Sequence, residues 1–140
     1  MDAREEHNKK WQFFQEITGI AMEVFNEYRF GILESAYEAA MAFLLRQNGF
    51  FVERQVMLPI YWKDTELEQT YRMDMLVNKN IIIELKTVKY ISKEHRSQLF
   101  HYLNLTHIPY GMLINFSPQG IYSEWYYRNE NGNIERVKLI

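Results

Sequence analysis

The start of the chain carries apolar residues at the spacing of two amphipathic helices. Between Asn8, a suitable N-cap, and Gly31, apolar side chains recur every three or four residues. The same period continues from Leu33 to Gln47, and Asn48-Gly49 follows it as a stop signal. We therefore expect two consecutive helices.

The pattern then changes to the alternation that is typical of strands. Val52 to Ile60 predicts a first strand, and Pro59 within it indicates an edge position. The polar stretch 63–69 is expected to be a loop, and two more strands follow at 71–77 and 81–88.

The second half of the chain adds a third helix and a buried strand. Ser92 is expected to cap a helix that runs to about Thr106, and the apolar run 110–116 predicts a strand inside a sheet. Strand 81–88, this helix and strand 110–116 form a βαβ unit, so the two strands are expected to be parallel.

The C-terminal segments 121–128 and 134–140 flank Asn131-Gly132, a dipeptide that favours a β-hairpin. No linker or repeat interrupts the 140 residues, and this length suits one domain. We therefore expect residues 1–140 to form a single α/β domain, in which helices flank a mixed sheet with a C-terminal hairpin.

Composition narrows the class of protein. Hydrophobic residues make up 47% and charged residues 24%, as in ordinary globular domains. The chain has no cysteine, which excludes disulfides and cysteine-ligated metal sites. No signal peptide is visible, and no apolar run reaches the ~18 residues that a membrane helix requires.

The charge distribution bears on nucleic-acid binding. A net charge of −2 argues against a protein held on nucleic acid by bulk charge. Residues 71–107 nevertheless carry six Lys or Arg and three Asp or Glu, including Lys79, Lys89, Lys93 and Arg96. We expect any nucleic-acid contact to be weak, salt-sensitive and centred on these cations, whereas the alternative is a chance cluster on a solvated surface.

Two carboxylates interrupt strands that are otherwise built for burial. Asp74 lies within the strand 71–77, and Glu84 follows three isoleucines and shares a strand face with Lys86. If residues 78–80 form a three-residue loop, with Asn80 left-handed, Asp74 falls directly opposite Glu84. Both carboxylates and the lysine would then lie on one face of the sheet.

This arrangement permits two interpretations. Neighbouring carboxylates repel unless one is protonated or a cation lies between them, and Mg²⁺ takes oxygen ligands of this kind. Lys86 could then orient an attacking water or stabilise charge on a phosphate. The alternative is a structural salt bridge between Glu84 and Lys86, with Asp74 facing solvent.

Two further polar positions accompany this set. Gln98 and Tyr102 share one face of the third helix, where a Gln among apolar residues requires hydrogen-bond partners. Glu34 opens the second helix, where a first-turn acid is favoured by the helix dipole. Taken singly, these residues also suit a surface Gln, a core Tyr and a capping acid.

Together, these motifs resemble a known family. Asp74 followed by Glu84-Leu85-Lys86 is similar to the D…(D/E)-x-K motif of the PD-(D/E)XK nuclease superfamily. Gln98 and Tyr102 resemble the Q-x-x-x-Y motif of its RecB-type branch. The segment from Gly31 through Glu34 to Tyr37 resembles the G-x-x-E-x-x-Y motif of a family of small bacterial proteins in that superfamily.

The resemblance spans about residues 10–117 and implies a restriction-endonuclease-like αβββαβ core in a cytoplasmic protein. It implies that Asp74, Glu84 and the Leu85 carbonyl bind Mg²⁺ or Mn²⁺, supported by Glu34. Lys86 would activate water, whereas Gln98 and Tyr102 would position the site or the substrate.

Three functions stay open at this level. The first is a Mg²⁺-dependent nuclease that acts on DNA. The second is a binding or accessory module that retains the fold without turnover, and the third is a purely structural protein. The sequence does not decide the polymer, its strandedness or the oligomeric state.

Overall fold

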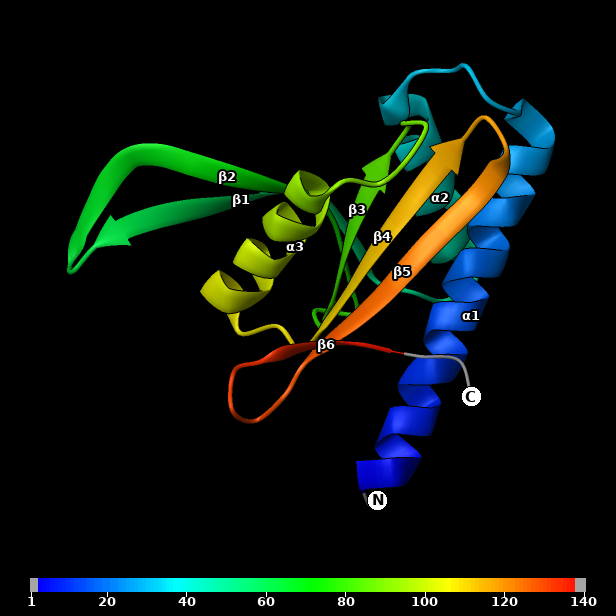
Figure 1. Ribbon diagram of the computed structural model, residues 1–140. Helices are drawn as coiled ribbons and strands as arrows, with labels where there is room; N and C mark the ends of the chain where they lie inside the picture. Colours follow the sequence, from blue (N-terminus) through cyan, green and yellow to red (C-terminus); the bar gives the residue numbers. More distant parts are fainter. Residues whose placement is uncertain (1–2, 138–140) are drawn as a thin grey trace.

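The computed structural model describes residues 3–137, which contain three helices and six strands in the predicted order. Helices precede the first three strands, and one helix separates the third strand from the fourth (Figure 1). The elements are α1 (Ala3–Tyr28), α2 (Glu34–Gln47), β1 (Val52–Trp62), β2 (Thr65–Val77), β3 (Ile81–Lys86), α3 (Lys93–Thr106), β4 (Tyr110–Ser117), β5 (Gly120–Arg128) and β6 (Ile134–Arg136).

The six strands form one mixed sheet in the order β1-β2-β3-β4-β5-β6. The strands β3 and β4 are parallel, as predicted for the two sides of a βαβ unit, and all other neighbours are antiparallel. The strand β1, which contains Pro59, lies at the edge. The predicted α/β fold is therefore confirmed.

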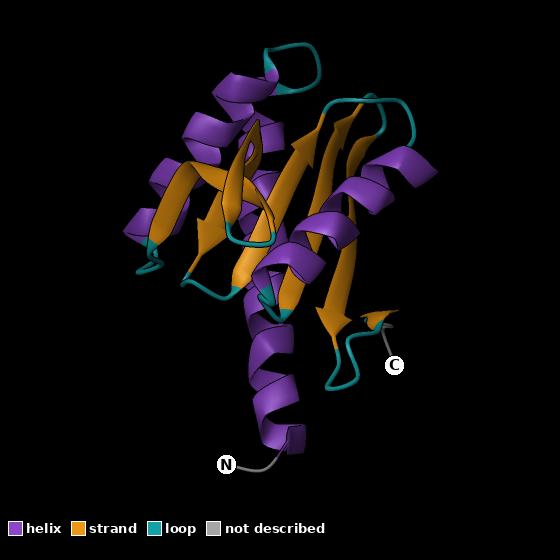
Figure 2. Cartoon of the chain, turned by 90° about the vertical axis from the view of Figure 1, so that its left-hand side faces the viewer, coloured by secondary structure: helices purple, strands orange, loops and turns teal. Residues whose placement is uncertain are grey.

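Helices cover both faces of this sheet, with α1 and α2 on one side and α3 on the other (Figure 1, Figure 2). Ile81, Ile83 and Leu85 join the apolar cluster under α1 and α2, whereas Ile82 joins the cluster under α3. Because both faces are buried, β3 is an almost continuous apolar run, and its acidic residue stands out. Within residues 3–137, no helix has the length and apolar character needed to cross a membrane.

The predicted loop at 63–69 is too long, because only residues 63–64 form the turn. Residues 65–69 begin β2, which pairs with β1 in a long hairpin that projects from the body beside α3 (Figure 1). Both faces of the hairpin end are exposed. No apolar alternation is needed there, because strand pairing satisfies the backbone while polar side chains remain in solvent.

Several boundaries also differ from the predicted ones. The helix α1 begins before Asn8, the predicted N-cap. The strand β3 ends at Lys86 and not at Val88, because the Asn115 side chain binds the N–H and the carbonyl of Val88. The hairpin of β5 and β6 is confirmed, but its loop spans residues 129–133, and residues 138–140 of the predicted last strand lie outside the described chain.

Candidate active site

The candidate site lies at a fork in the sheet, where β2 stops pairing with β3. Backbone pairing runs from Val77–Ile81 to Met75–Ile83. At the next position, the Asp74 N–H donates to Glu84 Oε1 (3.1 Å), and the Leu85 N–H donates to Asp74 Oδ2 (2.8 Å). The two carboxyl groups thus replace the ladder bonds that end where the hairpin diverges.

This geometry confirms the register expected from a three-residue turn. Val77 faces Ile81, so residues 78–80 form the loop. The left-handed residues are Asn78 and Lys79, with φ of 51° and 59°, and not Asn80 as predicted. An Asn in this conformation carries little strain, which explains the first of the two.

The surroundings of the carboxyl pair favour a shared proton. Glu84 is 2% exposed. Burial, followed by the charge of Asp74, raises the pKa of Glu84 to about 9, while Lys86 acts in the opposite direction. A hydrogen bond between the two side chains raises this pKa further. These surroundings favour one proton shared between the two carboxyl groups.

A chain of hydrogen bonds holds Lys86 next to this pair. Lys86 Nζ donates to Gln98 Oε1 (2.9 Å), and Gln98 Nε2 donates to Tyr102 Oη (3.1 Å). The Tyr102 hydroxyl donates in turn to the backbone carbonyl of Arg72 (3.2 Å). Among residues 3–137, Lys86 makes no ion pair with Glu84. The alternative of a structural salt bridge between Glu84 and Lys86 is therefore not observed among these residues, and Lys86 is instead hydrogen-bonded to α3.

One open cavity of about 650 Å³ brings the predicted residues together. Its walls include Glu34 from the start of α2, together with Asp74, Glu84, Lys86, Gln98 and Tyr102. Partial burial and the charge of Asp74 raise the pKa of Glu34, whereas Lys86 lowers it. Glu34 therefore lies within the electrostatic reach of the fork, although it comes from the opposite layer.

Sequence reasoning missed the buried Glu38, which lines the same cavity. Its carboxylate accepts from Arg54 Nη2 (2.9 Å) and from Gln55 Nε2 (2.5 Å), which ties α2 to β1. The available signal was its position four residues after Glu34, on the same helix face. Glu38 therefore supports the wall from which Glu34 projects.

The predicted basic residues lie in different places, and of the four only Lys89 and Arg96 line a common cavity in the described chain. Lys79 lies in the β2–β3 turn, at the other end of β3 from Lys86, and contacts Glu53 (3.2 Å). Lys93 begins α3 and lines an open groove beside Gln98. Arg96 is committed to the buried Glu124, with Nε and Nη2 at 2.8 and 2.7 Å from the two carboxylate oxygens.

The oxygen atoms at the fork suit the coordination of a hard divalent cation. Leu85 donates its N–H toward β2, and its carbonyl points the same way, because both groups of a strand residue face one neighbour. Among residues 3–137, no three His, Cys, Asp or Glu side chains are placed to hold a metal together. Mg²⁺ commonly uses one or two carboxylates and keeps several waters, so Asp74, Glu84 and the Leu85 carbonyl suffice.

Comparisons with known proteins bear on the fold and the family. No curated protein matches the chain. Among solved structures, the crystal structure of SSO0001 matches with a TM-score of 0.51 at 22% identity, covering 66% of this chain. The match spans 48% of that protein, so it shows likeness of fold alone. A family model described as the PD-(D/E)XK nuclease superfamily matches residues 11–126, and the chain belongs to this superfamily.

Proposed function

We propose that this protein is a Mg²⁺-dependent nuclease that hydrolyses phosphodiester bonds in DNA. One observation carries the proposal: at the sheet fork the buried Glu84 and the partly buried Asp74 lie together, and Gln98 holds a lysine beside them. Superfamily membership supports nuclease-like chemistry in general. The metal, the DNA substrate and the cytoplasm as its site of action are part of the proposal.

Each residue of the fork has a role in this scheme. Asp74, Glu84 and the Leu85 carbonyl would hold the ion, and Glu34 would complete or support its shell. When bound, the ion supplies Lewis-acid chemistry and lowers the pKa of a coordinated water. Because the carboxyl pair favours a shared proton without the ion, metal binding would release that proton.

Lys86 is the group suited to touch the reacting phosphate or the attacking water. Hydrolysis forms a bond from water oxygen to phosphorus and breaks the bond from phosphorus to the leaving sugar oxygen, while negative charge grows on the phosphate. A lysine fixed in place stabilises that charge without having to reorganise. Gln98 and Tyr102 act as positioning residues, because they hold Lys86 Nζ.

A non-catalytic nucleic-acid-binding module is the second candidate. The net charge of −2 favours it. This module would retain the fork as a structural feature without turnover.

Cleavage of end-labelled DNA in millimolar Mn²⁺ tests the two candidates. We expect the wild-type protein to cleave, Asp74→Asn and Lys86→Gln to lose cleavage, and Lys79→Gln, a cation outside the site, to retain it. Wild-type protein that leaves single- and double-stranded DNA intact, or Asp74→Asn protein that still cleaves, would reject the nuclease assignment.

A further inference from the structure

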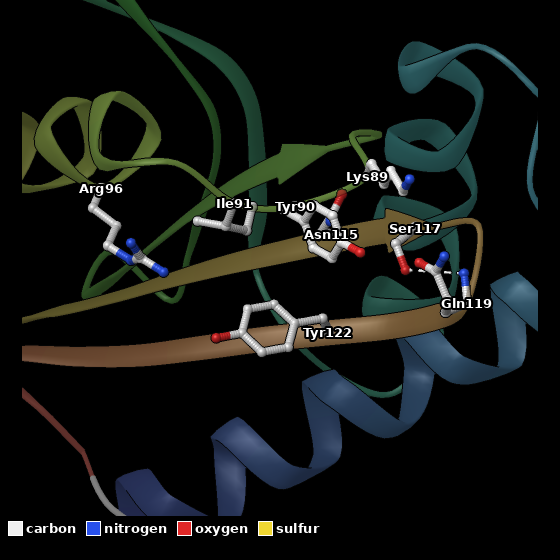
Figure 3. A pocket seen from close by; sticks show the side chains of 8 residues that line it. All are labelled: Lys89, Tyr90, Ile91, Arg96, Asn115, Ser117, Gln119 and Tyr122. Carbon is white, nitrogen blue, oxygen red and sulfur yellow. Dashed lines mark hydrogen bonds between the residues drawn. The ribbon is translucent and has the colours of Figure 1, made fainter.

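A second cavity, of about 490 Å³, opens on the α3 side of the sheet (Figure 3). Its walls come from the segment after β3, the first turn of α3, and the strands β4 and β5. Asn115, which lines it, pairs in register with Lys86, so the cavity begins one strand away from the candidate active site. Its volume is typical of small-ligand sites.

Exposed aromatic rings give this cavity its chemical character. Tyr90 is 73% exposed and Tyr122 is 43% exposed, and Ile91 adds an apolar side chain to the lining. The Lys89 ammonium lies 5.7 Å from the centre of the Tyr90 ring. Exposed rings beside cations are the elements with which proteins bind unpaired nucleotides, because every base has a π face.

Two cationic side chains, Lys89 and Arg96, line the cavity. Arg96 reaches toward the same space as Tyr122 (Figure 3), and its side chain is 34% exposed. Two of its five donors bind Glu124, which leaves donors for a second anion. Because Glu124 is itself buried and neutralised by Arg96, it does not repel a phosphate at the cavity mouth.

The wall of the cavity is held in place before any ligand arrives. The Asn115 amide accepts from the Val88 N–H (3.0 Å) and donates to the Val88 carbonyl (2.8 Å). These two bonds fix the segment that carries Lys89 and Tyr90. Lys86 and Lys89 are three residues apart, so their Cα atoms lie within about 11 Å, a span of a few nucleotides.

We propose that this cavity binds an unpaired nucleotide of the strand whose phosphodiester lies at the Asp74–Glu84 fork. The base stacks on Tyr90 and Tyr122, and the adjoining phosphate contacts Lys89 and Arg96. The inference rests on the proposed function and adds a substrate class to it. Paired bases are stacked on both faces and cannot enter, so the protein should prefer single-stranded nucleic acid.

Fluorescence anisotropy with labelled oligodeoxythymidine, at low salt and with EDTA present, tests the cavity without cleavage. We expect Tyr90→Ala to weaken binding about tenfold, in line with the loss of one stacked base. Tyr90→Phe, which keeps the ring, should bind as the wild type does. Tyr61→Ala is the matched control, because Tyr61 is 57% exposed on the projecting hairpin, outside the cavity.

The inference fails if the wild type does not bind the oligonucleotide, if it binds a labelled duplex equally well, or if Tyr90→Ala binds as the wild type does. Equal losses in Tyr90→Ala and Tyr61→Ala would also reject it. Cleavage is measured in parallel. Cleavage without dependence on Tyr90 would reject nucleotide binding in this cavity and leave the nuclease assignment standing. Tyr90-dependent binding without cleavage would support the cavity and reject the nuclease assignment.

Discussion

Two buried glutamates in one row across the sheet have opposite electrostatic surroundings. Glu84 on β3 and Glu124 on β5 both pair in register with Leu113 on β4, and they are 2% and 1% exposed. Burial and Asp74 raise the pKa of Glu84 to about 9. Burial also acts to raise the pKa of Glu124, but hydrogen bonds led by that of Arg96 outweigh it and lower this pKa to about 2.

The difference lies in the partners and not in the burial. Glu124 accepts two bonds from Arg96 and one each from Tyr122 and Tyr126, so its charge is compensated. Glu84 accepts a backbone N–H and faces another carboxyl group, and no arginine or lysine forms an ion pair with it in the described chain. A compensated buried acid stabilises the fold, whereas an uncompensated one in a cavity indicates a functional site.

The largest expected change in the free energy of unfolding comes from removing Arg96, the partner of Glu124. Arg96→Ala leaves a buried carboxylate with only the more distant Arg136, 4.0 Å away, and should lower the free energy of unfolding by about 3 kcal/mol. Denaturant unfolding measures it, with Lys93→Ala on the same exposed turn as the control, expected within about 0.5 kcal/mol of wild type. A loss below about 1 kcal/mol for Arg96→Ala would show that Glu124 is not held as described.

Acid should remove the same stabilisation without mutation. The folded pKa of Glu124 is about 2, below the ordinary value of 4.5, so its contribution is present above pH 4.5 and is lost as the pH falls toward 2. The loss should be on the order of 3 kcal/mol. The free energy of unfolding, measured across this range, should show this fall, here called the acid limb, in the wild type and not in Glu124→Gln. Identical pH profiles of the two proteins would contradict the role of Glu124.

Divalent metal ions should bind at Glu84 and stabilise the folded protein. At 100 times the dissociation constant, Mg²⁺ or Mn²⁺ should raise the free energy of unfolding by about 2.7 kcal/mol. Thermal melts should show this gain in wild type and Lys86→Ala, and its loss in Asp74→Ala and Glu84→Ala. An absence of any shift in wild type at millimolar Mn²⁺ would count against a metal site at the fork.

Without metal, Glu84 should give the opposite pH dependence to Glu124. Its folded pKa of about 9 lies above 4.5, so its contribution is fully present below pH 4.5 and is lost as the pH rises through 9. Glu84→Gln in EDTA should therefore be more stable than wild type at pH 9, by about 1–2 kcal/mol after local relaxation. If the wild type is at least as stable as this variant at pH 9, the charge of Glu84 is compensated in the folded protein and the prediction is wrong.

The smallest effects on the free energy of unfolding should come from Tyr126 and Tyr102, which both belong to the apolar cluster under α3. Tyr126→Phe removes a hydrogen bond to Glu124 and should cost about 1 kcal/mol at neutral pH and reduce the acid limb. Tyr102→Phe removes a similar bond, from its hydroxyl to the Arg72 carbonyl, and should leave that limb unchanged. A reduced acid limb in Tyr102→Phe would mean that the two glutamates do not titrate independently.

Much of the candidate site could be predicted from the sequence, because its geometry is local. Strand alternation places Glu84 and Lys86 on one face, and a three-residue turn sets Asp74 opposite Glu84. The helical spacing of Gln98 and Tyr102 likewise follows from the chain itself. Each of these relations depends on residues within one element or one hairpin.

Only the tertiary structure decided which charges meet across elements. Arg96 and Glu124 are 28 residues apart and come from a helix and a strand, so nothing in the local pattern separates Arg96 from a free surface cation. The direction of the β1–β2 hairpin likewise depends on where β2 leaves β3. Long-range packing sets these positions, and through them the opposite pKa shifts of two glutamates that look alike in the sequence.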